Sequence, residues 1–448
     1  MRPFSHRKAS TMKIKAIKKP YEEVIEEYRS HKSEHIKPKK PNIFFRTLLK
    51  LVSVPDLTST HFNCEKIGMD KLGRKEPALF LMNHSSFIDL EIVASALYPR
   101  SFNIVTTTDG FIGKDWLMRH IGCIPTKKFV ADTTSVRDIM HTVKNLRSSI
   151  VMFPEAGYSL DGTATTLPDT LGSFVKMLDI PLVMITTYGA FSRDPLYNNL
   201  QKRKVRVSAT VEYLLDRDQI HAMPADEINA LIHEKFGFDY FKWQQEHHVR
   251  IGEAFRADGL ERALYKCPDC GKEGRMHGEG ITLKCLECGK THELNEYGSL
   301  IPVTSDDGFT HVPDWYRWER EEVRKEIEAG EYELDTPVNV WISLDTKKLY
   351  DIGEGRLRHT IDGFALTDAK GNLLYEHKPL ASYSICADFN FYEVGDVISI
   401  ANPECIYYCF PKDQTIPVAK ARLAAEEIYK IKYEEKLAAR KAKQDAQG

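Results

Sequence analysis

Two short polar segments, each directly after an apolar run, constrain this chain more than any other feature. Residues 83–89 (NHSSFID) follow the apolar run 78–82, and residues 153–159 (FPEAGYS) follow the run 150–152. The apolar runs predict two buried strands. Both polar segments are then expected at the carboxyl edge of one sheet, where open α/β folds place their ligands. The sequence therefore predicts an α/β domain with a site built from both segments.

The first segment contains a histidine and an aspartate that suit proton transfer. A histidine accepts a proton from a hydroxyl near neutral pH, most effectively when a carboxylate holds its other ring nitrogen. His84 and Asp89 are five residues apart, which would place them about 140° apart on one straight helix. They can therefore meet only if His84 lies in the turn before a helix and Asp89 in its first turns. One of the two serines at positions 85 and 86 is expected to cap that helix.

The spacing itself is not specific, because it recurs at His221 and Asp226. That second copy has Pro224 between its two members and no apolar strand before it. We therefore interpret it as chance, and base the assignment of His84 on the strand that precedes it and on the second segment downstream.

Four blocks occur in the order found in the glycerolipid acyltransferase superfamily, and the chain resembles its 1-acylglycerol-3-phosphate acyltransferases. The blocks are residues 83–89, 122–128, 153–159 and 180–183, and the resemblance extends over about residues 41–262. It implies a mixed sheet flanked by helices and an enzyme of phospholipid biosynthesis. The implied reaction moves a fatty acyl group from acyl-CoA or acyl carrier protein to a hydroxyl of a lysophospholipid or related lipid precursor. His84 would be the general base, and Asp89 would hold its imidazole.

The resemblance also implies substrate-binding roles around these two residues, for Asn83, Lys127, Lys128, Glu155, Gly157, Tyr158 and Arg193. Two positions depart from the family pattern. Lys128 replaces an arginine and loses its bidentate fork, and Tyr158 replaces another arginine with a neutral hydroxyl. Either a further cation such as Lys127 or Arg193 compensates, or the acceptor is not a simple glycerol phosphate.

Four cysteines predict a metal site downstream. Cys267, Cys270, Cys285 and Cys288 form two C-x2-C pairs with fourteen residues between them, and a glycine follows each pair. This pattern predicts a tetrahedral structural zinc in a small ribbon, residues 263–300. Disulfides are the alternative, which a cytoplasmic location disfavours. Because four cysteines close the site, we expect the zinc to support folding.

The last third of the chain is predicted to be rich in strands. After a linker with a charged helix at 301–335, about seven short strands alternate with turns, one of them at residues 353–355, and a helix follows at about 418–440. Residues 336–440 thus predict a small barrel or bent sandwich, similar in outline to pleckstrin-homology-like domains, before a tail at 441–448. A non-catalytic protein that binds lipid or a partner through the ribbon and this domain is the alternative function.

The N-terminal part suggests contact with a membrane surface. The first 50 residues carry 14 Lys and Arg against five Glu, whereas the whole chain has a net charge of −2, so no nucleic-acid partner is expected. The basic arm, residues 1–40, is predicted to lie on anionic headgroups or to remain a solvated tail. Residues 41–52 predict an amphipathic helix that either enters the membrane interface or packs on the domain core. The residues expected on its apolar face are Phe44, Phe45, Leu48 and Leu51.

No apolar run reaches the roughly 18 residues of a membrane span, and no signal peptide is recognisable at the start. From these absences the sequence predicts a cytoplasmic protein that is peripheral on the inner face of the membrane.

Overall fold

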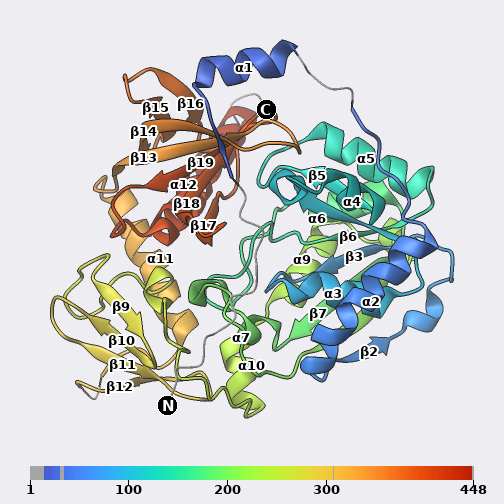
Figure 1. Ribbon diagram of the computed structural model, residues 1–448, viewed down its shortest axis with the longest axis horizontal. Helices are drawn as coiled ribbons and strands as arrows, with labels where there is room; N and C mark the ends of the chain where they lie inside the picture. Colours follow the sequence, from blue (N-terminus) through green and yellow to red (C-terminus); the bar gives the residue numbers. More distant parts are fainter. Residues whose placement is uncertain (1–14, 31–34, 306, 446–448) are drawn as a thin grey trace.

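The computed structural model describes residues 15–30, 35–305 and 307–445. Their elements form three groups in Figure 1: an α/β region, a small four-stranded sheet, and an eight-stranded sheet with the C-terminal helix. Within these residues no helix combines the length and the apolar character that a membrane crossing needs.

The α/β region is built on a mixed seven-stranded sheet, as predicted. Its strand order is β2-β8-β7-β3-β6-β4-β5, and all neighbouring strands are parallel except β7 and β8. The strands are β2 (Asn63–Ile67), β3 (Leu79–Met82), β4 (Phe102–Thr107), β5 (Cys123–Thr126), β6 (Ser149–Met152), β7 (Leu182–Tyr188) and β8 (Ser208–Leu215). The α-helices are α2 (Ile43–Ser59), α3 (Ile88–Leu97), α4 (Asp115–His120), α5 (Thr133–Lys144), α6 (Leu171–Leu178), α7 (Ala190–Arg193), α8 (Arg217–Ala222), α9 (Ala225–Phe236) and α10 (Tyr240–Glu246).

Alternate residues of β3 enter two different apolar cores. Phe80 and Met82 pack into the core that α2 and α3 cover, whereas Leu79 and Leu81 pack into the core under α5, α6 and α9. A central strand that helices cover on both faces needs apolar side chains on both faces, which explains the unbroken apolar run. Because β3 lies between β7 and β6, the turn after it lies in the middle of the sheet's carboxyl edge.

The other two sheets are antiparallel, apart from one parallel edge pairing. The four-stranded sheet has the order β12-β11-β10-β9, and the main path of the larger sheet is β16-β15-β14-β13-β19-β18-β17. Their strands are β9 (Met276–Glu279), β10 (Thr282–Cys285), β11 (Thr291–Leu294), β12 (Leu300–Pro302), β13 (Leu334–Ser343), β14 (Tyr350–Thr360), β15 (Gly363–Asp368), β16 (Leu373–His377), β17 (Cys386–Phe391), β18 (Gly395–Ala401) and β19 (Ile406–Pro411). The helices of this part are α11 (Val312–Glu328) and α12 (Val418–Asp445).

The turn predicted at residues 353–355 is wrong, because these residues lie inside β14. The register between β13 and β14 shifts at this point, and Gly353 has a φ of 93°. Glycine within a strand often marks such a bulge, where the chain needs a positive φ but pairing continues.

One continuous apolar core crosses the domain boundaries that the sequence predicts after residue 262. It contains Tyr240 of α10, Leu283 of β10, Trp315 of α11 and Val340 of β13. The ribbon and the strand-rich part therefore pack on the α/β region directly instead of being joined to it only by linkers.

Residues 17–30 of the basic arm pack on the eight-stranded sheet. The short strand β1 (Ile17–Lys18) pairs in parallel with β14, and α1 (Tyr21–Ser30) buries Val24 in the core. Both predictions for this segment, an arm on lipid headgroups and a solvated tail, are therefore wrong for residues 17–30. The apolar residues Tyr21, Val24 and Tyr28 share one helical face, and this face packs against the protein core. Residues 1–14 and 31–34 of the arm lie outside the described part of the chain.

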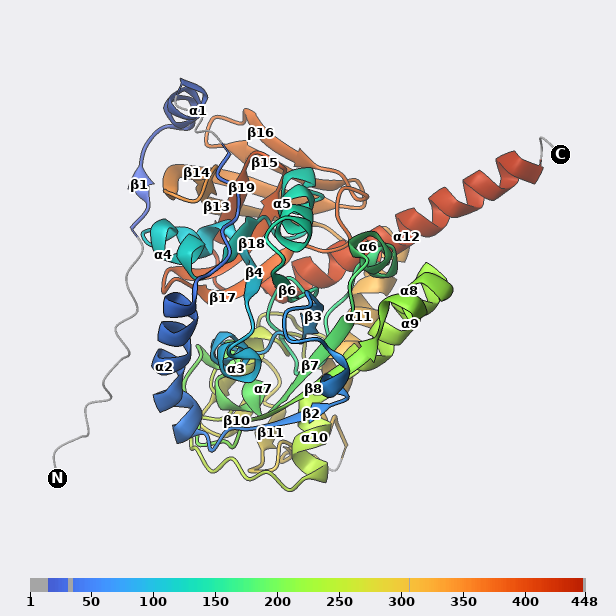
Figure 2. The same cartoon turned by 90° about the vertical axis from the view of Figure 1, so that its right-hand side faces the viewer.

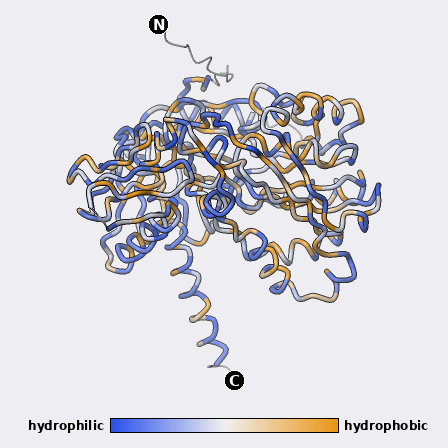
Figure 3. The backbone as a smooth tube through the Cα atoms, turned by 90° about the horizontal axis from the view of Figure 1, so that it is seen from below, coloured by the Kyte–Doolittle hydropathy of each residue, from blue (hydrophilic) through white to orange (hydrophobic). Residues whose placement is uncertain are grey.

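Helix α2 has an apolar face toward the protein and a second one toward the outside. Phe45 packs against a small buried cluster around Phe111, whereas Phe44, Leu48 and Leu51 are exposed. Figure 2 shows α2 along the outer edge of the molecule. At the other end of the chain, the last turns of α12 project from the body as a mostly hydrophilic helix (Figure 3).

Candidate active site

The two polar segments meet at the carboxyl edge of the seven-stranded sheet. β3 and β6 are paired neighbours, so the turns that follow them lie side by side. The backbone N–H of His84 donates to Oε1 of Glu155 at 2.8 Å, and the N–H of Ser159 donates to the carbonyl of His84 at 3.3 Å. Pairing of the two strands thus brings the predicted base, His84, into direct contact with Glu155.

His84 lies in the turn before α3, and Asp89 lies in the first turn of that helix. Nδ1 of His84 is 2.9 Å from Oδ2 of Asp89. The same oxygen accepts hydrogen bonds from the N–H groups of Ser85 and Ser86, at 2.8 and 3.1 Å. No serine side chain caps the helix, which differs from our expectation: the buried carboxylate of Asp89 binds these N–H groups instead. A carboxylate suits the helix N-terminus because it carries full negative charge.

The imidazole of His84 is held between two aromatic rings. Its centroid is 4.3 Å from the ring of Phe153 and 4.3 Å from the ring of Tyr158. Burial raises the pKa of Tyr158 well above its ordinary value, so this residue is a neutral ring against the imidazole. With Nδ1 directed at Asp89, the remaining ring nitrogen, Nε2, is the one available to a substrate.

The side chain of Glu155 is buried behind the turn that carries His84, where it bonds to backbone N–H groups, and it does not line the cavity described below. Its side chain is 2% exposed, Oε1 accepts from His84, and Oε2 accepts from the N–H of Thr165 at 2.9 Å. Burial raises the pKa of Glu155 to about 7, although these two backbone hydrogen bonds oppose the shift. The geometry therefore gives Glu155 a positioning role in place of the contact with the acceptor that the resemblance implied.

The side chain of Asn83 also bonds to other residues of the protein and does not line the cavity described below. Its Oδ1 accepts from the N–H of Thr187 at 2.9 Å, and its Nδ2 donates to the hydroxyl of Tyr240. That hydroxyl is also bonded to Ser85. The sequence offered no sign of Tyr240, which joins the site from α10 through tertiary packing alone.

A large cavity of about 2220 Å³ opens in front of His84. Of the predicted site residues, His84, Asp89, Lys127, Lys128, Tyr158 and Arg193 line it, whereas Asn83, Glu155 and Gly157 do not. The opposite wall comes from the C-terminal part, which the sequence did not connect with the site. Prominent residues of that wall are Tyr383, Asp388, Phe391, Tyr392, Tyr429 and Tyr433.

Comparison with known proteins identifies the part that carries both segments. Residues 63–188 match a family model described as Acyltransferase. These residues form an acyltransferase domain. This finding confirms the resemblance to the glycerolipid acyltransferase superfamily that the motifs suggested.

Two further comparisons were made, with curated proteins and with solved structures. No curated protein matches the chain. Among solved structures it is similar to the 1-acyl-sn-glycerophosphate (LPA) acyltransferase PlsC from Thermotoga maritima, with a TM-score of 0.34 and 12% identity over 43% of this chain and 76% of that one.

Three cationic side chains that line the cavity, those of Lys127, Lys128 and Arg193, have partners within the protein. Nζ of Lys127 donates to the carbonyl of Pro403 at 2.6 Å, and Nζ of Lys128 lies 3.6 Å from Sγ of Cys386. Burial lowers the pKa of Lys128, but the neighbouring Cys386 and two aspartates outweigh burial, and the net shift is upward. Arg193 forms ion pairs with Asp194 and Asp56. None of these charges is therefore free of a protein partner.

The four predicted metal ligands also come together. Their sulfur atoms all lie within 4.8 Å of one another, with 3.6 Å between Cys267 and Cys288 and 3.7 Å between Cys270 and Cys285. Four thiolates around a zinc ion with Zn–S bonds of about 2.3 Å are about 3.8 Å apart. No disulfide joins these cysteines, and this donor set and spacing fit a metal ion.

The raised pKa of Glu155 makes the stability of the acyltransferase domain depend on pH. The unfolded chain loses this proton near pH 4.5 and the folded protein only near 7, so folding binds the proton more tightly. The contribution to stability is complete below about pH 4.5 and is lost as the pH rises through about 7. We expect the free energy of unfolding of wild type, relative to Glu155→Gln, to fall over this interval and then level off.

Chemical denaturation at a series of pH values measures this difference. Exposed Glu287→Gln is the control for the loss of one carboxylate. A difference that stayed constant between pH 4.5 and 7 would show that Glu155 titrates in the folded protein as it does in the unfolded chain.

Proposed function

We propose that the protein is an O-acyltransferase that moves a fatty acyl group from an acyl thioester to a hydroxyl of a lysophospholipid or related lipid precursor. The observation that supports this most is the bond from Nδ1 of His84 to the buried carboxylate of Asp89, at the mouth of the cavity. Together with the acyltransferase domain that contains both residues, it provides a base in a defined tautomer.

In the proposed reaction Nε2 of His84 takes the proton of the acceptor hydroxyl. The oxygen attacks the thioester carbonyl, and the tetrahedral intermediate then expels the thiolate. The thiolate takes the proton back from the imidazolium, so the enzyme returns to its starting state. Asp89 keeps Nδ1 protonated and stabilises the imidazolium by its negative charge. Phe153 and Tyr158 hold the ring plane fixed during both proton transfers.

The cavity suits a substrate with an acyl chain. Apolar side chains make up part of its lining, including Ile104, Val105, Ile139, Met152 and Phe174. Lys127, Lys128 and Arg193 remain candidates for contact with a headgroup or with the donor, acyl-CoA or acyl carrier protein. Because each already has a protein partner, a bound phosphate would have to share or replace it.

The C-terminal part is proposed to consist of a zinc ribbon and a pleckstrin-homology-like domain. In the larger sheet, seven consecutive strands run in the order 4-3-2-1-7-6-5 and a helix follows the last one. This is a fold analogy and gives no function by itself. In the proposed enzyme, the strand-rich domain and α12 form the far wall of the cavity.

We further propose that α2 rests on the cytoplasmic face of a membrane. Phe44, Leu48 and Leu51 are exposed on one side, and Trp116 of α4, which is 65% exposed, adds to this surface through the ring of Phe45. An exposed apolar patch of this kind marks an interaction surface. Docking here would bring the cavity close to lipid substrates.

Substitution of the base tests the reaction. We expect His84→Ala to abolish transfer and Asp89→Asn to lower the turnover number by a factor of about 10² to 10⁴, since tautomer control is lost. The measurement is thiol release from acyl-CoA with mixed lysolipids. His221→Ala is the matched control, because His221 also pairs with an aspartate, Asp179, but at an exposed site.

Thiol release that persists in His84→Ala at most of the wild-type rate would contradict the assignment of the base. An absence of release from wild type with every acceptor and either donor would favour the alternative, a protein that binds lipid or a partner without turnover.

Removal of the exposed apolar side chains tests the membrane surface. Each large side chain that leaves water contributes about 1.5–3 kcal/mol, so Phe44→Ser with Leu51→Ser should weaken binding to anionic phospholipid vesicles more than tenfold. Vesicle sedimentation measures this. Leu437→Ser, which changes another exposed leucine on the projecting end of α12, is the control, and an equal loss in both proteins would argue against docking through α2.

Loss of one thiolate tests the zinc site. Purified wild type should contain zinc at one ion per chain by elemental analysis, and Cys270→Ser should lose most of it and unfold at a lower temperature. Cys64→Ser, which removes a cysteine outside the cluster, should change neither. Metal-free wild type that melts like the loaded protein would rule out a structural role.

A further inference from the structure

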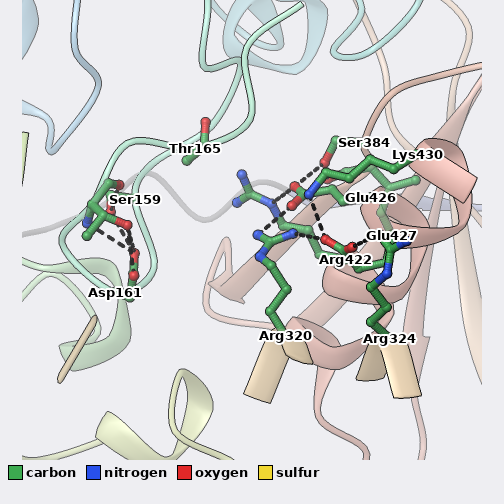
Figure 4. Close-up of polar contacts among 12 residues, drawn as sticks. Ser159, Asp161, Thr165, Arg320, Arg324, Ser384, Arg422, Glu426, Glu427 and Lys430 are labelled. Atoms are coloured by element: carbon green, nitrogen blue, oxygen red, sulfur yellow. Dashed lines mark hydrogen bonds and ion pairs between the residues drawn. The ribbon is translucent and has the colours of Figure 1, made fainter. Parts of the chain in front are cut away.

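A second, smaller pocket of about 150 Å³ lies beside the loop that continues from Glu155. Residues 160–165 form one wall. Three arginines line the pocket opposite this loop: Arg317 and Arg320 from α11, and Arg422 from α12. Figure 4 shows Arg320 and Arg422 on one side and the loop with Asp161 and Thr165 on the other.

Arg422 is the most informative of these side chains because it is 5% exposed and only partly bonded. Its Nε donates to Oε1 of Glu426 at 3.1 Å. Within the described residues, neither of its terminal nitrogens, Nη1 and Nη2, has an acceptor. In Figure 4 the end of the Arg422 guanidinium is directed at the loop that carries Thr165. Neither nitrogen is among the fully buried atoms that lack a partner, so both are accessible from the pocket that Arg422 lines and can donate to a ligand there.

The two buried carboxylates of the arginine wall, Glu426 and Glu427, are each shared among several cations. Arg320 pairs with Glu426 at 2.7 Å and with Glu427 at 3.0 Å. Glu426 is therefore shared between Arg320 and Arg422, and Glu427 is shared with Arg324 and Lys430. Arg317, at the rim of the pocket, is largely exposed and pairs with Asp314 at 3.0 Å.

The loop wall does not neutralise these arginines. The carboxylate of Asp161 accepts from the N–H and hydroxyl of Thr163 and from the hydroxyl of Ser159. No ion pair joins Asp161 to an arginine in the part of the chain that the structure describes, and burial raises its pKa. A pocket with a cationic wall and a hydrogen-bonded loop thus remains between the two parts of the protein.

We propose that this pocket binds a phosphate group, held by the guanidinium groups of Arg422, Arg320 and Arg317. The planar fork of arginine matches the oxygens of phosphate in spacing and charge, and the small volume admits a phosphate with little attached to it. Free inorganic phosphate and a small phosphate monoester are the two sources of this chemistry.

Two short series of contacts link the pocket to the candidate active site. Thr165 lines the pocket, and its N–H binds Oε2 of Glu155, whose Oε1 holds the turn at His84. Glu426 lines the large cavity and pairs with Arg422. A bound phosphate therefore fastens the loop behind Glu155 to α11 and α12; this consequence for catalysis rests on the proposed function, whereas the binding does not.

Isothermal titration calorimetry of the full-length protein tests the binding. One arm uses inorganic phosphate and the other glycerol 3-phosphate, in buffer with chloride at constant ionic strength. We expect saturable binding in at least one arm, and the arm with the tighter binding identifies the source. Arg422→Gln should bind at least about tenfold more weakly, because charge-assisted hydrogen bonds are lost. Arg324→Gln is the matched control, since this arginine of α11 also pairs with Glu427 but does not line the pocket.

Arg317→Gln keeps the test decisive if Arg422→Gln does not fold, because Arg317 is exposed and its loss leaves the buried ion pairs intact. It should weaken binding several-fold at unchanged melting temperature. Wild type without saturable binding in either arm overturns the proposal, as does binding that Arg324→Gln weakens as much as the two pocket variants do. Because heat of binding is the readout, these outcomes are separate from whether thiol release occurs.

Discussion

The buried carboxylate of Glu155 is the contact on which the arrangement around His84 depends. It has no cation within ion-pair distance among the described residues, and its two oxygens instead accept the N–H groups of His84 and Thr165. It thereby joins the turn after β3 to the loop after β6. A neutral side chain of the same shape could not accept both bonds, since one end of an amide donates. This bridge holds the backbone of His84 beside the loop that carries Thr165, which lines the arginine pocket.

The sequence predicted best those features that depend on neighbours along the chain. The strands β3 and β6, the turn that holds His84 and the meeting of His84 with Asp89 follow from local periodicity and from helix geometry. The four-cysteine cluster followed from spacing for the same reason. Glu155 was placed at the right edge of the sheet, but the direction of its side chain, toward the N–H groups of His84 and Thr165, could not be predicted, because no local pattern shows which way a buried carboxylate points.

Features that depend on distant parts of the chain could not be predicted in this way. The partners of Asn83, Thr187 and Tyr240, come from β7 and α10, and those of Lys127 and Lys128 come from the strand-rich part. The motifs around these residues resemble those of other acyltransferases, but here their side chains are bonded to segments that the motifs do not include. The second wall of the cavity accordingly comes from the strand-rich part and from α12, which the motifs do not include.

The pairing of β1 with β14 has a consequence for the order of folding. β1 and α1 are made among the first residues, yet the strand and the core they join belong to the last third of the chain. Contacts between residues so far apart in sequence form late. During synthesis the N-terminal segment therefore has no strand to pair with until β14 has been made, and it docks only after that point.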